Sequence, residues 1–167
     1  MWMGRWWAWI WCAAAGAVLP GLAPPVAAES WDRIGRYADL IRQAGTQTLV
    51  ANDCPPALLG AFHEGRNALL LCANNLANDP GQIWTVLAHE SAHVMQHCHG
   101  GPLLAVEQLG EARETIRRQS SQALRELRLY HPSQQREELE ARLVQGLPAA
   151  EVEALFRRFC AERLIRR

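Results

Sequence analysis

Two histidines and a glutamate near the middle of the chain have the types and spacing of a metal-dependent hydrolytic site. The segment HESAH places His89 and His93 four residues apart, with Glu90 directly after the first histidine. On an α-helix, residues i and i+4 lie on one face about 6 Å apart, so both imidazoles can bind one ion. Zinc lowers the pKa of a bound water to about 7, and an adjacent carboxylate can take its proton. The motif therefore predicts Zn²⁺ bound by His89 and His93, with Glu90 as the general base.

A catalytic zinc ion usually has three protein ligands, so a third ligand is expected outside HESAH. We predict Glu138, because a helix through residues 136–142 would carry it on one side with Ala141. A small residue at that position allows two helices to approach closely. Glu137 and Glu140 belong to the same acidic run and remain alternatives.

Two histidines nearer to the motif compete for the role of third ligand. His99 lies where the pattern HExxHxxGxxH has its third histidine, but Gln96 occupies the glycine position. His97 follows His93 by four residues, yet three histidines along a straight helix span about 12 Å, too far to surround one ion. We interpret His97 and His99 as residues at the rim of the site or supporting its ligands. His99 also stays open as a third ligand.

The proposed geometry requires HESAH to lie on a helix, and the flanking residues predict one. Asp79 can cap a helix whose first residue is Pro80, and Gln82 can reach back to the cap. Gly100 and Gly101 follow the last histidine and suit the end of a helix. We therefore expect a continuous helix from Pro80 to Gly100.

Apolar periodicity in the rest of the chain predicts a mainly helical domain. Further helices, each followed by a Gly or Pro signal or by the chain end, are expected over residues 30–45, 109–130, 133–146 and 148 onward. Two short runs, 46–51 and 68–72, are expected to be strands. The predicted fold class is therefore α+β, mainly α.

The first 28 residues have the pattern of an export signal. Arg5 precedes an apolar stretch over residues 6–19, and small side chains at 26–28 suit cleavage before Glu29. Proline and glycine within residues 20–25 interrupt this stretch before the roughly 18 apolar residues that a membrane span needs. We predict a signal peptide over 1–28, one domain over 29–167, no stable membrane span after cleavage, and a secreted or periplasmic location.

Four cysteines remain after the predicted cleavage, an even number that suits two disulfides in an oxidising compartment. Of the three possible pairings we favour Cys54 with Cys72 and Cys98 with Cys160, because the first pair brackets a predicted hairpin. No CxxC spacing typical of zinc-binding cysteines occurs.

With these motifs in view, the chain resembles the gluzincin class of zinc peptidases, particularly its small single-domain members, the minigluzincins. The resemblance rests on HESAH at 89–93 and on ELEAR at 138–142, which is similar to the ExxA segment on a later helix of that family. It implies a zincin-like core in which His89, His93 and Glu138 bind zinc and Glu90 is the general base.

The resemblance also implies an antiparallel β-hairpin beside the HExxH helix, with an edge strand that aligns the substrate backbone. Residues 68–72 are in the right place for it. The chain departs from the family at Arg142, where many relatives have Asp or Asn.

These observations favour an exported zinc metalloendopeptidase with a peptide or protein as its substrate. The chain has 17 acidic and 17 basic residues, and this balance gives no electrostatic footprint for nucleic acid. The alternative is a non-catalytic metal-binding domain or a disulfide-stapled helical interaction domain. Glu90 favours catalysis, because a binding site needs no carboxylate directly beside its histidines.

Overall fold

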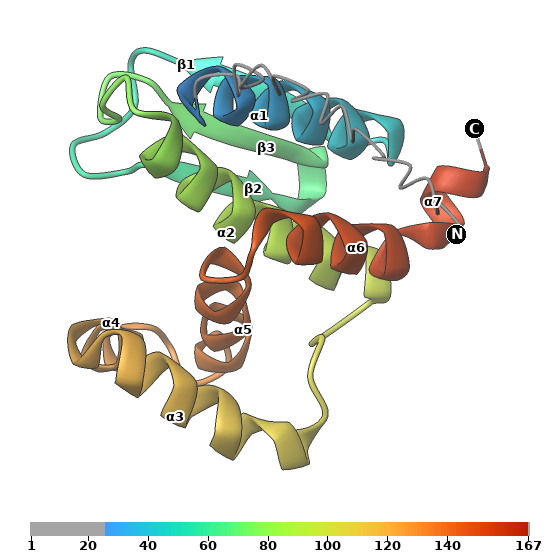
Figure 1. Cartoon of the computed structure of the whole chain (residues 1–167). Helices are drawn as coiled ribbons and strands as arrows, with labels where there is room; N and C mark the ends of the chain where they lie inside the picture. Colours follow the sequence, from blue (N-terminus) through green and yellow to red (C-terminus); the bar gives the residue numbers. More distant parts are fainter. Residues whose placement is uncertain (1–25, 167) are drawn as a thin grey trace, which may run out of the picture.

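A small sheet and a long central helix form the core of the protein, and further helices surround them (Figure 1). The structure, a computed structural model, describes residues 26–166. The strands are β1 (Gln47–Ala51), β2 (Gly60–His63) and β3 (Ala68–Cys72). The helices are α1 (Val26–Gln43), α2 (Pro80–His99), α3 (Leu109–Gln119), α4 (Ser121–Glu126), α5 (Gln135–Gln145), α6 (Ala149–Phe159) and α7 (Ala161–Ile165), with short 3-10 turns η1 (Glu64–Arg66), η2 (Val106–Gln108) and η3 (Leu127–Leu129). The prediction of a mainly helical α+β fold is confirmed.

The N-terminal prediction is only partly covered by the described residues. Residues 1–25 of the predicted signal peptide lie outside them, and α1 begins at Val26, four residues before the predicted cap Ser30. Among residues 26–166, no helix combines the length and the hydropathy needed to cross a bilayer.

The sheet has the strand order β1-β3-β2, with β1 parallel and β2 antiparallel to β3. The expected hairpin beside the HExxH helix is present, formed by β2 and β3, and α2 packs against both strands. The assignment of residues 68–72 to its edge was wrong, because they form the central strand and β2 is the edge beside α2. Ala68, Leu69 and Cys72 of this strand are buried, as an apolar run in the middle of the sheet requires.

Helix α2 forms as its flanking residues predict. The Asp79 side chain accepts a hydrogen bond from the backbone N–H of Gln82 at 2.7 Å, and Pro80 is the first helical residue. Gln82 reaches back two residues beyond the cap, since its Oε1 accepts from the backbone N–H of Ala77 and not from that of Asp79. Gly100 ends the helix with φ 79°, a left-handed conformation that glycine adopts without strain.

Helix α2 contacts α1, β2, β3, α5 and α6, and it therefore organises the core. Ala92 on α2 and Ala141 on α5 are both fully buried and belong to the same apolar cluster, as small residues between two packed helices do. The packing of α5 against α2 brings Glu138 to His89 and His93. A second, smaller apolar cluster joins α3, η3 and α5.

The prediction of a single helix over residues 109–130 is wrong, because the helix is interrupted at Ser120. This residue has an extended conformation, with φ −158° and ψ 109°. Its N–H still bonds to the Ile116 carbonyl of α3, while its hydroxyl accepts from the N–H of Ala123 and caps α4. Serine favours such a cap over a helix interior, since its side chain can replace a missing backbone acceptor.

Both predicted disulfides are confirmed. Cys54–Cys72 joins the loop before β2 to the end of β3, and Cys98–Cys160 joins the last turn of α2 to the end of α6. Together they indicate an oxidising environment outside the cytoplasm. The second bridge anchors the C-terminal helices directly to the helix that carries HESAH.

The Cys98–Cys160 bridge is expected to stabilise the fold more than Cys54–Cys72 does. The two bridges span 62 and 18 residues. Loop-closure entropy then predicts a loss in unfolding free energy of about 4 kcal/mol for the double variant Cys98→Ala/Cys160→Ala and about 3 kcal/mol for Cys54→Ala/Cys72→Ala. Urea unfolding of both variants beside the wild type measures this. An equal or larger loss for the shorter loop would contradict the entropic explanation.

Candidate metal centre

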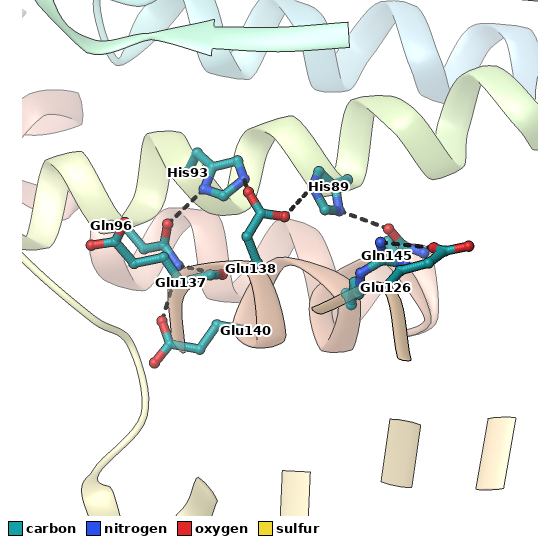
Figure 2. A network of polar contacts seen from close by, with 9 residues as sticks. His89, His93, Gln96, Glu126, Glu137, Glu138, Glu140 and Gln145 are labelled. Atoms are coloured by element: carbon teal, nitrogen blue, oxygen red, sulfur yellow. Dashed lines mark hydrogen bonds and ion pairs between the residues drawn. The ribbon is translucent and has the colours of Figure 1, made fainter. Parts of the chain in front are cut away.

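Three side chains from two helices converge at one point between α2 and α5. His89 and His93 project from α2, and the Glu138 carboxylate projects from α5 and lies between them (Figure 2). The Glu138 carboxylate oxygens lie 3.6 Å from Nε2 of His89 and 3.5 Å from Nε2 of His93. One potential ligand atom from each residue lies within 4.8 Å of the other two, so the group could hold a metal ion. Within residues 26–166 this is the one such group of three.

The alternatives for the third ligand are placed elsewhere. Glu140 is 1% exposed and its carboxylate accepts the backbone N–H groups of Leu103 and Leu104. His97 also lines the cleft, but it is not part of the three-residue group, and its Nδ1 pairs with Glu64 at 3.0 Å. His99 Nδ1 lies 3.0 Å from the Pro102 carbonyl, toward the end of the helix. Glu137 borders the same cleft as the three-residue group but is not part of the group.

The chemistry of this group fits a divalent cation. Glu138 Oε2 is buried and has no hydrogen-bond partner, whereas most buried polar atoms have one. Burial alone would raise the pKa of Glu138, but the adjacent His89, His93 and Arg142 outweigh it and lower the pKa. Two imidazole nitrogens and a carboxylate oxygen are a ligand set that zinc accepts. A cation between them would satisfy the unpaired oxygen.

The Nδ1 atom of each histidine contacts the side-chain amide of a glutamine. His89 Nδ1 lies 2.8 Å from Oε1 of Gln145, and His93 Nδ1 lies 2.8 Å from Oε1 of Gln96. Sequence reasoning did not find these partners. Gln96 stood out only as a departure from a glycine pattern, and nothing near Gln145 in the sequence marks it. Both contacts turn Nε2 of the histidine toward Glu138 (Figure 2).

Glu90 lies beside the group and is buried against the edge strand. It is 8% exposed, and burial raises its pKa to about 7, with the nearby His89 acting in the opposite direction. A Cβ atom at Gly60 would lie 2.7 Å from Val86 and 3.0 Å from Glu90, so only glycine lets β2 approach α2 this closely. The approach also brings the Phe62 backbone to the Glu90 carboxylate as a hydrogen-bond partner.

The group opens into a cleft of about 660 Å³ between β2 and the segment that leads into α5. One wall is formed by Gly60, Ala61 and Phe62 of β2, and the other includes Tyr130 and Gln134. His89, Glu90, His93, His97 and Glu138 also line it. Because the same cleft is lined by the edge strand and by the three-residue group, a ligand in it can contact both.

Comparison with known proteins gives a family. A protein-family model described as a domain of unknown function, DUF8637, matches residues 38–161. Since this segment is more than half of the chain, the protein belongs to that family. The segment contains the three-residue group, Glu90 and all four disulfide-bonded cysteines. No curated protein and no solved structure matches the chain.

Proposed function

We propose that the protein is an exported zinc metallopeptidase of the gluzincin type, with a zincin-like core, which hydrolyses peptide bonds in an extended peptide or protein substrate. The observation that carries the proposal is the buried carboxylate of Glu90, which lines the same cleft as His89, His93 and Glu138. A purely metal-binding site has no use for such a group. The two disulfides support a secreted or periplasmic location.

The residues present have distinct roles in this proposal. His89, His93 and Glu138 would hold the ion, and zinc bound there supplies a Lewis acid that polarises a carbonyl and acidifies water. Glu90 accepts a proton from the attacking water, whose hydroxyl adds to the carbonyl carbon. Glu90 then passes the proton to the amine that leaves when the C–N bond breaks. Strand β2 forms one wall of the cleft and can align an extended backbone beside this base.

Removal of zinc is expected to abolish hydrolysis. The protein is purified without chelators and incubated with a complex mixture of peptides, and mass spectrometry identifies new termini. Cleavage should fall to background with o-phenanthroline and return when zinc is added. The isomer m-phenanthroline, which does not chelate, should leave cleavage unchanged.

Two outcomes would contradict the proposal in different ways. Cleavage that persists after complete zinc removal would exclude a zinc-dependent mechanism. A protein that binds one zinc ion per chain but cleaves nothing in the mixture would favour the alternative of a non-catalytic metal-binding domain.

A further inference from the structure

Gln96 occupies the centre of a hydrogen-bond chain that links α2 to α5. Its amide nitrogen donates to the carbonyl of Glu137 and to the carboxylate of Glu140, both at 3.0 Å. Its amide oxygen lies 2.8 Å from Nδ1 of His93. Gln96 is 5% exposed, so water does not replace these partners. Every polar atom of this side chain is therefore engaged.

This arrangement determines the tautomer of His93. The Glu137 carbonyl and the Glu140 carboxylate can only accept hydrogen bonds, so the amide nitrogen of Gln96 must face them. The amide oxygen of Gln96 therefore faces the imidazole of His93. An amide oxygen only accepts, and His93 must then carry its proton on Nδ1. The lone pair is left on Nε2, the atom that faces Glu138.

Glu140 extends this series of hydrogen bonds to the loop after α2. Its carboxylate accepts from Gln96 and from the backbone N–H groups of Leu103 and Leu104, at 2.8 and 3.1 Å. Only a side chain that accepts from an imidazole and donates to a carboxylate can connect His93 with Glu140. Glutamine does both, whereas glutamate at position 96 would place one carboxylate against another.

Gln145 makes the corresponding contact to His89. It lies on α5, seven residues after Glu138, and its Oε1 is 2.8 Å from Nδ1 of His89. Arg142 occupies the position one turn after Glu138, but its guanidinium is directed to Glu126 at 3.0 Å. The orienting partner of His89 therefore comes from the next turn of the helix. Within residues 26–166, no carboxylate is hydrogen-bonded to Gln145, whereas Gln96 donates to Glu140.

We propose that Gln96 and Gln145 are positioning residues that hold His93 and His89 with Nδ1 protonated and Nε2 directed at the metal. The proposal deepens the proposed function and rests on it for the identity of the ion. Gln96 must also donate a hydrogen bond to Glu140, whereas Gln145 has only to accept one from His89. The two positions should therefore respond differently to the same substitution.

Zinc affinity tests the positioning role without measuring hydrolysis. In the full chain, the single variants Gln96→Met and Gln145→Met remove the acceptor at nearly constant volume. Each is expected to raise the zinc dissociation constant by about 10- to 100-fold, measured by competition with a chromophoric chelator. Gln43→Met, at an exposed position on α1, is the matched control and should bind zinc like the wild type. Affinities within twofold of the wild type in both test variants would overturn the proposal.

Substitution by glutamate separates the two amides. Gln145→Glu keeps an acceptor for His89 and is expected to bind zinc within a few-fold of the wild type. In Gln96→Glu the new carboxylate faces that of Glu140, and zinc affinity is expected to fall at least tenfold. Equal effects at the two positions would contradict the requirement for donation at 96.

The tautomers can be observed directly, whether or not zinc is bound. Long-range ¹H–¹⁵N spectra of the histidine rings should show His89 and His93 with protonated Nδ1, and Gln96→Met should lose this preference at His93 alone. If the wild type binds no zinc but shows these tautomers, the proposed function fails and the positioning role stands. If it binds zinc with Nδ1 of His93 unprotonated, the positioning role fails.

Discussion

Replacement of Glu90 by glutamine is expected to lower peptide turnover by about 10²- to 10⁴-fold, the range that a positioned general base contributes. Glutamine has nearly the same shape but cannot take a proton from water. Glu90 is not one of the three convergent residues, so zinc content should stay at about one ion per chain. The measurement combines initial rates on a cleaved peptide with elemental analysis of the same sample.

Glu151→Gln is the matched control for this prediction. Glu151 is exposed on α6 and does not line the cleft, so its substitution removes the same charge away from the site. It should retain the wild-type rate and zinc content. A Glu90→Gln variant that turns over at the wild-type rate would show that another group, or none, takes the proton.

Replacement of Glu138 by alanine is expected to eliminate stoichiometric zinc binding. Two histidines then remain, and their Nε2 atoms lose the carboxylate that lies 3.5–3.6 Å from both. A ligand that binds only the folded state stabilises it, by about 2.7 kcal/mol at 100 times the dissociation constant. We therefore expect zinc at that excess to raise the melting temperature of the wild type and to leave that of Glu138→Ala unchanged.

Glu137→Ala tests the choice among the glutamates of α5. Glu137 is adjacent to Glu138 and borders the same cleft, but it is not part of the three-residue group. This variant should bind zinc and gain stability from it like the wild type. If Glu137→Ala loses zinc while Glu138→Ala keeps it, the third ligand is Glu137.

Local features of the sequence were sufficient to predict the elements that carry the site. The N-terminus of α2 is determined within four residues, by a side-chain cap at Asp79 and a proline that cannot donate. Once that helix forms, the four-residue spacing of His89 and His93 places both on one face, with Glu90 beside them. The cysteine pairing also followed from the order of elements, because Cys54 and Cys72 flank the hairpin.

Strand β2 and the positioning glutamines depend on contacts that the sequence does not display. The segment GAFH is short and begins with glycine, and it becomes a strand because β3 and α2 lie beside it. Its place at the edge of the sheet likewise depends on the parallel pairing of β1 with β3.

The sequence by itself therefore determined the helix that carries HESAH, the mainly helical fold class and the acidic segment from which Glu138 comes. Only the tertiary structure decided which glutamate of that segment meets the histidines and which side chains orient them. The physical reason is separation along the chain: Gln145 reaches a histidine 56 residues away, and Gln96 reaches a glutamate 44 residues away. Such contacts depend on how α5 packs across α2, and no periodicity within either helix encodes that angle.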